Sequence, residues 1–462
     1  MYISNAVSIL TKACTKAADV ICRHREVVVV SHIDADGLTA AGIICTSLKR
    51  AGIDYQPLFF RQLDPSALDQ IADQGTDLVI FTDLGSGMQT AIKERGLNAV
   101  IADHHRPSGS GVDLHINPHL AGLDGATHLS GSGSAFLLAR ALGQNDDLAG
   151  LAIVGAVGDL QDMAGGRLVG VNRTILEVGA KAGVLSYQRD LKLFGKQTRP
   201  VFKMILYSQD PYIPGLSGNE DACIVFLKEL GIRSGGERWR RWIDLTQEEK
   251  GRTVTALVRK GLRTGISSSR LERLVGEVYT LLLEDEGTEL RDASEYSTLL
   301  NATARYGHSD VGLGVCMGDR SASLEEARVL LKEHRQNLVN GLKLVKEDGI
   351  TSLNHLQYFD AGDRILDTIV GIVAGMSFQM ADRSKPILAF ARDENENLKV
   401  SARGTQDLVQ SGLNLAEALS EAAAQVNGVG GGHNVAAGAT IPVAAKEEFL
   451  DLMDSAVGRQ LG

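Results

Sequence analysis

The first hundred residues alternate short apolar runs with longer amphipathic segments. Strand-like runs over 27–32, 55–60, 77–83 and 98–103 alternate with segments of helical spacing over 38–51, 65–72 and 88–95. Short apolar runs that alternate with helices of about ten residues indicate a parallel sheet with right-handed crossovers. We therefore expect an α/β fold here, with ligand sites beyond the carboxyl ends of the strands.

The pattern changes twice farther along the chain. A helix that begins after Leu129 runs to Leu142, a second covers 147–157, and mainly helical segments continue to about Leu283. Apolar positions over 323–347 have the spacing of one long helix, and strand-like runs return over 351–359, 386–391 and 398–402. We predict an N-terminal parallel-sheet domain (1–184), a helical insertion (185–325), a connecting helix (326–348) and a smaller C-terminal α/β domain (349–462).

Composition is that of an ordinary globular protein. A length of 462 residues exceeds what one core usually organises, so two or three domains are expected. The apolar stretches fall short of the ~20 residues of a membrane span, and the N-terminus lacks the pattern of a signal peptide. The five cysteines form no Cys-x-x-Cys pair and are odd in number, which favours reduced thiols. We expect a cytoplasmic protein without membrane contact.

Charge is unevenly distributed along the chain. The formal net charge of −10 argues against a protein that coats nucleic acid nonspecifically, whereas residues 228–273 hold 12 Lys and Arg against 6 Asp and Glu. Within this stretch the basic run, Arg238–Trp242, combines cations with two tryptophans. It fits a single-strand binding surface, an amphipathic helix with its tryptophans in the core, or a docking site for a replication partner.

Acidic and imidazole side chains follow the ends of the strand-like runs. They are His32, Asp34 and Asp36; Asp83; Asp103, His104 and His105; and Asp159 with Asp162. Hard divalent cations prefer carboxylate oxygens, and imidazole adds a preference for manganese, zinc or iron. One central carboxylate could bridge two ions of a hydrolytic site. A single Asp at a strand end is commonly a helix cap, and a single-metal or nucleotide site stays possible.

The order of these motifs resembles the DHH phosphoesterase superfamily. His-x-Asp-x-Asp-Gly, Asp-Leu-Gly, Asp-His-His and Gly-Asp are followed far downstream by Gly-Gly-Gly-His-x-x-Ala-x-Gly over 430–438. More narrowly, the chain resembles the archaeal RecJ-like single-strand-specific exonucleases, including the GINS-associated nuclease. In bacterial RecJ the first motif usually opens with Asp where this chain has His32, a departure that favours the archaeal branch and manganese.

The resemblance implies a role for each motif residue. One metal ion would be held by His32, Asp34 and Asp83, and the other by Asp36, Asp83, His104 and Asp159, with Asp83 shared. Asp103 would orient a neighbouring ligand, and His105 would contact the scissile phosphate or protonate the leaving oxygen. Two ions of Mn²⁺ or Mg²⁺ would be the cofactor, and the active-site cleft would lie between the two α/β domains.

Other polar residues receive weaker interpretations. Gly430, Gly431 and Gly432 are expected to form a turn that lets a nucleic acid backbone approach, with His433 as a further donor and Arg403 gripping phosphate, as the resemblance implies. Asp162 is expected to be a solvated or capping carboxylate, and His115 and His119 to shape the loop beside the site. The segment 130–134 fits either phosphate binding at a helix start or tight packing.

The expected function is a metal-dependent exonuclease that degrades single-stranded DNA, and possibly RNA, to mononucleotides in replication or repair, with 5′ to 3′ polarity carried over from bacterial relatives. An alternative is a hydrolase of short oligonucleotides or cyclic dinucleotides. A second alternative is a structural partner of the replicative helicase through GINS, although every proposed ligand is present.

Overall fold

The computed structural model describes residues 2–232, 239–393 and 396–462. The chain forms two compact units, Met1–Leu331 and Lys332–Gly462. Each unit is described by itself. Across the described ranges, none of the helices has both the length and the apolarity needed to cross a bilayer.

The first unit contains a five-stranded sheet in the order β2-β1-β3-β4-β5, and every neighbouring pair is parallel. The strands are β1 (Glu26–His32), β2 (Asp54–Phe60), β3 (Val79–Thr82), β4 (Ala99–Ala102) and β5 (Leu114–Ile116). The parallel sheet predicted from the sequence is confirmed. Strands β3 and β4 are shorter than expected, so Asp83 and Asp103 lie just beyond their ends.

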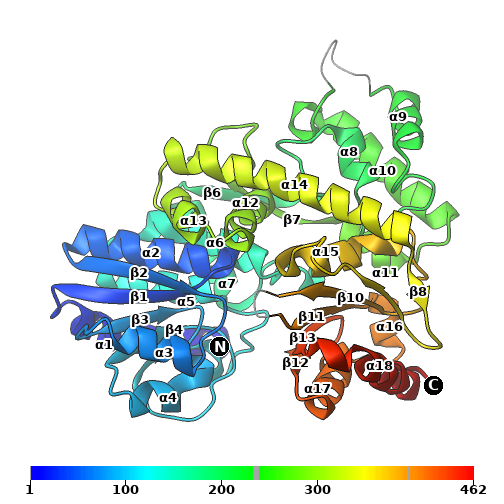
Figure 1. Cartoon of the computed structure of the whole chain (residues 1–462). Helices are drawn as coiled ribbons and strands as arrows, with labels where there is room; N and C mark the ends of the chain where they lie inside the picture. The colour runs from blue at the N-terminus through cyan, green and yellow to red at the C-terminus, as the bar shows by residue number, and fades with distance from the viewer. Residues whose placement is uncertain (1, 233–238, 394–395) are drawn as a thin grey trace. The chain divides into compact units, whose positions relative to one another are not determined.

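Helices cover both faces of this sheet because alternate strand residues point to opposite sides (Figure 1). Val27 and Val29 share one core with a first set of five helices and with three helices from later in the chain, whereas Val28 and Val30 share another core with a second set of two. The first set is α1 (Tyr2–Ile21), α2 (Ala35–Ala51), α5 (Gly131–Leu142), α6 (Ala149–Gly158) and α7 (Gly170–Lys181); the second is α3 (Pro65–Ala72) and α4 (Gln89–Glu94).

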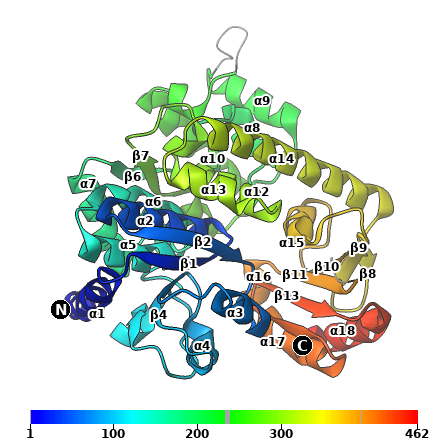
Figure 2. The same ribbon diagram turned by 60° about the vertical axis from the view of Figure 1, so that its left-hand side comes forward.

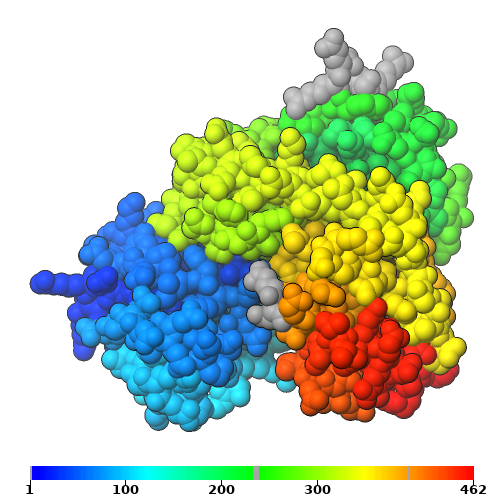
Figure 3. All heavy atoms as spheres, viewed as in Figure 1, coloured from blue at the N-terminus to red at the C-terminus, as the bar shows by residue number. Residues whose placement is uncertain are grey.

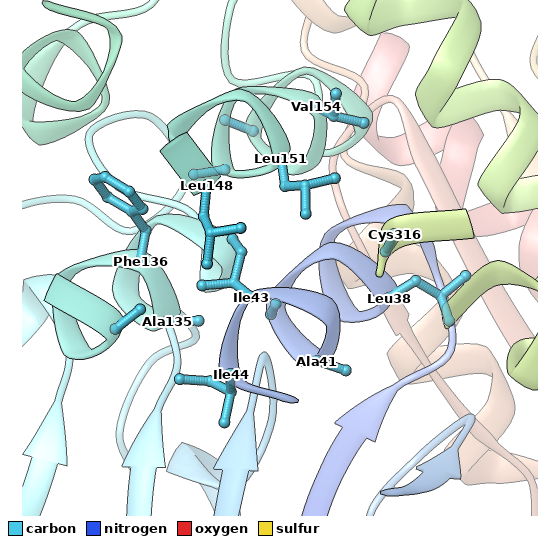
Figure 4. Packing of buried hydrophobic residues seen from close by; sticks show 14 of the residues in the cluster. Leu38, Ala41, Ile43, Ile44, Ala135, Phe136, Leu148, Leu151, Val154 and Cys316 are labelled. Carbon is cyan, nitrogen blue, oxygen red and sulfur yellow. The ribbon is translucent and has the colours of Figure 1, made fainter. Parts of the chain in front are cut away.

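Helix α2 lies in the middle of the larger core. Its Leu38, Ile43 and Ile44 are fully buried and belong to the same cluster as Phe136 of α5 and Leu151 of α6 (Figure 4). Because close packing on several sides fixes this helix, its first turn is a rigid support for the motif that begins at His32.

The middle of the chain is more than a set of helices. Strands β6 (Leu185–Leu191) and β7 (Val275–Leu281) form an antiparallel pair, and described residues between 191 and 274 contribute to one hydrophobic core. This part of the chain is green in Figure 3. That segment contains α8 (Val201–Leu206), α9 (Glu220–Glu229), α10 (Gln247–Arg263) and α11 (Ser268–Leu271). Helices α12 (Ala293–Arg305) and α13 (Ser309–Cys316) pack in the core of α2 instead. The expected insertion over 185–325 therefore contains two differently packed parts.

The basic run does not form an amphipathic helix. Trp242 begins a short 3₁₀ turn and is 1% exposed, and the Trp239 ring lies 4.8 Å from that of Phe202. Arg240 donates to both carboxylate oxygens of Glu249, at 2.6 and 2.8 Å, and Arg241 donates to Asp244 at 3.1 Å. The described part of the run is thus tied into the local fold. Arg238 lies outside the described residues.

The long helix predicted over 323–347 is confirmed as α14 (Ala322–Asp348). Its first turns contribute Leu324 and Leu331 to the core around α2, and its later turns contribute Val345 to a core of the second unit.

The second unit is built on a six-stranded sheet in the order β12-β13-β11-β10-β9-β8, in which only β9 and β10 run parallel. Helix α15 packs on one face and helices α17 and α18 on the other (Figure 2). The strands are β8 (Thr351–Ser352), β9 (Gln357–Asp360), β10 (Ile387–Arg392), β11 (Leu398–Arg403), β12 (Val429–Gly432) and β13 (Ala436–Ile441); the helices are α15 (Asp367–Met376), α16 (Gln406–Gln410), α17 (Leu415–Gln425) and α18 (Lys446–Leu461).

The expectation of a turn at Gly430, Gly431 and Gly432 was wrong. These residues form the edge strand β12, and the turn comes after them, where His433 N donates to Ala436 O at 2.8 Å. Packing explains the difference, because a Cβ at Gly430 would lie 2.7 Å from the carbonyl oxygen of Leu419 in α17. Close approach of a helix, rather than a bend in the chain, requires glycine there.

Candidate metal centre

The first motif leaves strand β1 and enters helix α2 within three residues. His32 ends β1, Asp34 caps α2 by accepting from Gly37 N at 3.0 Å, and Asp36 lies in the first helical turn. Strand β3 ends just before Asp83. The φ of Asp83 is 57°, a left-handed conformation that Asp tolerates better than most residues. This backbone turns the Asp83 side chain back toward the first motif.

The structure brings the six predicted metal ligands together in two groups. In each, one ligand atom from every residue lies within 4.8 Å of the others. The first ligand group is His32, Asp34 and Asp83, and the second ligand group is Asp36, His104 and Asp159.

Asp83 joins the two groups. Its Oδ2 lies 3.6 Å from His32 Nδ1, and its Oδ1 lies 3.3 Å from His104 Nε2. One oxygen of the carboxylate therefore faces each group, which is the placement expected of a bridging ligand between two ions.

Helix α5 fixes Asp36. The backbone N–H groups of Gly131 and Ser132 donate to its two carboxylate oxygens at 2.7 and 3.0 Å, and Ser130 caps the helix. A side chain at Gly131 would collide with Asp83, and one at Gly155 with Asp36. The first N–H groups of α5 hold a ligand carboxylate, so of the two interpretations of 130–134 the structure favours packing over phosphate binding.

Asp103 supports the loop that carries the two histidines. Its Oδ1 accepts from His104 N at 2.7 Å and from His105 Nδ1 at 2.8 Å, and its Oδ2 accepts from Ser86 N at 3.0 Å. The carboxylate is fully buried, whereas the His105 side chain is 59% exposed. Asp103 therefore has the contacts of an orienting residue, and His105 is accessible to a substrate.

A hydrogen-bonded network lies behind this loop. His115 Nε2 lies 2.8 Å from Ser86 Oγ, and Asn117 donates to both Ser86 Oγ and the carbonyl of His105, each at 2.9 Å. Asn117 also accepts from His119 N at 2.9 Å. Both histidines thus take part in shaping the loop.

Negative charge is concentrated in the two ligand groups. Burial and the neighbouring Asp83 raise the pKa of Asp36 to about 8, and burial raises the pKa of Asp159. Burial alone would lower the pKa of His32, but Asp34 and Asp83 outweigh it and raise that pKa to about 11. The concentrated negative charge favours protonation of these side chains, and a bound cation would compete with those protons.

The residues fit divalent cations. Asp83 Oδ1 is buried and accepts no hydrogen bond from the described residues, a costly arrangement unless a cation satisfies it. Carboxylate oxygens with two imidazole nitrogens are a donor set suited to manganese, and to magnesium where oxygen dominates.

Two polar residues of α12 were missed in the sequence. Asn301 Oδ1 accepts from Ala35 N at 3.0 Å, which ties α12 to the first motif. One turn later, Arg305 is stabilised by the charge of Asp34, while burial lowers its pKa and its Nε has no hydrogen-bond partner in the described part of the chain. Their spacing of four, which puts both on one face of α12, is a signal that could have identified them.

Asp162 stays outside both ligand groups, as expected, but it is not solvated. It is 5% exposed and forms an ion pair with Lys192. The expectation of a solvated carboxylate was wrong because a lysine thirty residues away covers it.

The predicted nucleic acid contacts lie in the second unit. Arg403 ends β11 and is paired in register with Ala436, next to the pairing of Gly432 with Ala437, so Arg403 and the end of β12 share one end of the sheet. The Arg403 side chain passes over Gly371 of α15 and donates to Ala402 O at 2.8 Å. Binding by Arg403, Gly430, Gly431, Gly432 and His433, and a cleft between the units, stay predictions.

Three family models match the chain. They are the DHH family, N-terminal domain over residues 26–156, the DHH-CID domain over 193–275 and the DHHA1 domain over 356–459. The six metal-ligand candidates lie within or just after the first match, and Arg403 and β12 lie within the third.

Curated proteins from archaea and bacteria are similar in sequence. The uncharacterised protein MJ0831 of Methanocaldococcus jannaschii is 32% identical over 441 residues, which cover 94% of this chain and 93% of that protein. The single-stranded-DNA-specific exonuclease RecJ of Bacillus subtilis is 30% identical over 166 residues, which cover 33% of this chain but only 21% of RecJ.

Solved structures share the fold. RecJ of Thermus thermophilus in complex with Mn²⁺ matches 97% of this chain and 55% of its own at a TM-score of 0.60 and 18% identity. CDC45 of Entamoeba histolytica matches 97% of this chain and 99% of its own at a TM-score of 0.67 and 10% identity.

Proposed function

Because the chain belongs to the DHH family, we propose that it is a metal-dependent exonuclease that hydrolyses single-stranded nucleic acid to mononucleotides. The observation that carries this proposal is the position of Asp83, whose two oxygens face the two ligand groups. The sequence relation to RecJ supports a phosphodiester as the substrate, although RecJ aligns over only part of its length.

The first ligand group would hold one cation and the second ligand group the other, with Asp83 shared. Two divalent cations supply the Lewis acidity that activates a nucleophile and neutralises phosphate charge. The histidine in each group favours Mn²⁺ over Mg²⁺, and RecJ of T. thermophilus has been solved with each of these ions.

His105 is proposed to protonate the leaving oxygen. Its hydrogen bond to Asp103 raises the pKa of the imidazole, which favours the protonated ring. Asp103 accepts from Nδ1 and leaves Nε2 for the substrate. This is the division of roles between an orienting carboxylate and an imidazole acid.

Arg305 is proposed to bind a non-bridging phosphate oxygen. Its buried Nε has no hydrogen-bond partner among the described residues, and its guanidinium is influenced by Asp34 of the first ligand group. A phosphate beside that group would satisfy it by a charge-assisted hydrogen bond.

The second unit is proposed to hold the strand while the first cuts it. Arg403, which is half-buried, and the glycine edge strand β12 lie at one end of a sheet. Backbone N–H groups without side chains allow close approach of a phosphodiester. We further propose 5′ to 3′ digestion of DNA, with RNA as a second substrate, in the cytoplasm during replication or repair.

Digestion of end-labelled single strands tests the proposal. Single-stranded DNA and RNA are incubated with Mn²⁺ or Mg²⁺, and the order in which labels are released gives the polarity. Asp83→Asn should abolish release, whereas Asp69→Asn, at an exposed carboxylate that pairs with Arg95, should leave it unchanged. Full activity of Asp83→Asn would refute the two-cation centre. Equal cleavage of a dinucleotide and a long strand would favour an oligonucleotide phosphodiesterase.

The likeness to CDC45 favours a second candidate, a structural partner of the replicative helicase that binds GINS. Retention of every proposed ligand argues that such binding accompanies catalysis. Measuring GINS binding and nuclease activity on the same preparation distinguishes the two functions.

A further inference from the structure

Gln161 is a buried amide directly beside the second ligand group. It follows Asp159 by two residues, in the turn after α6, and is 1% exposed. Its Nε2 donates to Asp159 Oδ2 at 2.9 Å and to the carbonyl oxygen of Gly125 at 2.8 Å. Both hydrogens of the amide are therefore used, one of them on a metal-ligand candidate.

A second buried amide fixes the orientation of Gln161. Asn172 Nδ2 donates to Gln161 Oε1 at 2.6 Å, and Asn172 is itself anchored through its backbone N–H to His128 O at 3.0 Å. A flipped Gln161 would place its oxygen against a carboxylate and a carbonyl, and its NH₂ against that of Asn172. Only one orientation satisfies all three partners.

The carbonyl of Gly125 connects Gln161 with the second imidazole ligand. It also accepts from His104 Nδ1 at 2.8 Å. Since a carbonyl oxygen can only accept, Nδ1 carries the hydrogen and Nε2 is left to face the carboxylates of Asp83 and Asp36. A histidine ligand that donates its other N–H to a carbonyl has its ring plane and tautomer fixed.

One amide thus supports two of the three members of the second ligand group. It holds the Asp159 carboxylate directly and holds the carbonyl that orients His104. Among the described residues, the polar contacts of the first ligand group run elsewhere, from Gly37 N to Asp34 and between His32 and its neighbouring carboxylates. Among these contacts, Gln161 therefore supports the second ligand group and not the first.

We propose that Gln161 is a positioning residue that sets the cation affinity of the second ligand group, separately from that of the first, with Asn172 locking it in place. The inference rests on the proposed two-cation centre. It also explains why an amide is needed, because a carboxylate at 161 would repel Asp159 and an apolar side chain would supply no donor.

Mn²⁺ titration calorimetry on the full chain tests the inference. Gln161→Met keeps the length and burial of the side chain but removes both donors. The unmodified chain should bind two Mn²⁺ ions, and in Gln161→Met the affinity for one of them should fall roughly tenfold to a hundredfold. Affinity for the other should stay within about twofold. Asn172→Ser removes the lock, together with a long hydrogen bond of 3.4 Å from Ser130 N, and should weaken the same ion by a smaller factor, so the inference stays testable if Gln161→Met folds poorly.

Gln357→Met is the matched control. Gln357 is 2% exposed, donates to two backbone carbonyls in the second unit and accepts from Asp382 N. Its replacement should lower the melting temperature without changing either Mn²⁺ affinity. If Gln161→Met behaves in the same way as this control, Gln161 has a merely structural role and the inference is overturned.

Nuclease kinetics supply an independent readout. In Gln161→Met the Mn²⁺ concentration for half-maximal activity should rise by the same factor as the weakened affinity, while kcat at saturating Mn²⁺ recovers to within about threefold. A kcat that stays low at saturation would contradict a positioning role. An unmodified chain that binds two Mn²⁺ ions without cleaving nucleic acid would refute the proposed function and leave the calorimetric test valid, whereas a chain that binds no Mn²⁺ would refute both.

Discussion

Two charged regions of the first unit, the basic run and the metal centre, differ in how their charges are paired. Around the basic run, Arg240 has Glu249, Arg241 has Asp244 and the Trp242 indole donates to Asp190 at 2.9 Å. In the metal centre four carboxylates surround two imidazoles, and one buried oxygen of Asp83 accepts no hydrogen bond from the described residues.

The difference distinguishes a cluster of charges that has a structural role from one that has a functional role. Where each charge has a partner of opposite sign from the chain, the cluster stabilises its own fold and needs nothing else. Where like charges are buried together, the protein needs a ligand of opposite sign to complete it. A run of charged residues in the sequence does not reveal which case applies.

The largest expected effect tests whether His105, the exposed partner of Asp103, acts in catalysis. His105→Asn should lower kcat about a hundredfold or more at saturating Mn²⁺ because the leaving oxygen loses its acid. Steady-state kinetics and Mn²⁺ titration give the two quantities. His24→Asn, at a histidine that contacts Val20 O on α1, is the control and should change neither. Loss of Mn²⁺ affinity in His105→Asn would place this residue among the ligands instead.

The next prediction concerns stability. We expect a cation to stabilise the metal centre, whose negative charges are not compensated, and not the basic run. Mn²⁺ at a hundred times its dissociation constant should add about 2.7 kcal/mol to the free energy of unfolding for each independent site. Thermal melts with Mn²⁺ and with EDTA measure it. Asp83→Asn should lose most of this gain, whereas Glu249→Gln should keep it. An equal gain in Asp83→Asn would show that the cation binds elsewhere.

A smaller effect is expected at Arg305, a cation near the metal centre whose Nε has no hydrogen-bond partner in the described chain. Arg305→Gln should lower kcat/KM roughly tenfold to thirtyfold through KM, since it removes a charge-assisted contact to phosphate. Initial rates over a range of oligonucleotide concentrations measure it. Arg305→Lys should recover part of the loss. A Gln variant with unchanged KM would make the arginine a structural residue.

The smallest effect is expected in the compensated region. Glu249→Gln should cost about 0.5–1 kcal/mol of stability and leave nuclease activity unchanged. Hydrogen bonds from Arg240 lower the pKa of Glu249 from 4.5 to about 2. A depressed pKa stabilises the folded chain above pH 4.5, and this contribution is lost as the pH falls toward 2. Urea melts at pH 7 and pH 3 should therefore show a smaller difference between variant and parent at pH 3.

Much of the centre could be predicted because local rules and the fold agree there. Parallel strands end at one edge of a sheet, so motifs that follow strands in the sequence come together in space, as those ending at His32, Asp83 and Asp103 do. Helix α14 was found for the same reason, since its apolar spacing is strictly periodic.

Other residues depended on packing between distant segments. The sequence around Asp162 suggests a solvated carboxylate, but Lys192 forms an ion pair with it in the fold. Arg305 interacts with the charge of Asp34 from a helix more than 250 positions farther along the chain. The glycines of β12 have a composition that favours a turn, but their pairing with β13 and the approach of α17 decide for a strand. Gln161 was missed because its importance lies in its three hydrogen-bond partners rather than in its residue type.

The backbone groups that donate to Asp36 also determine when, during synthesis and folding, the metal centre can form. Gly131 N, which holds its carboxylate, is 95 positions farther along the chain. A chain synthesised only as far as residue 130 already contains most of the ligands but lacks the helix that organises one of them. Such a long closure is a late event in folding. We therefore expect Mn²⁺ to slow unfolding of the finished protein rather than to accelerate its formation.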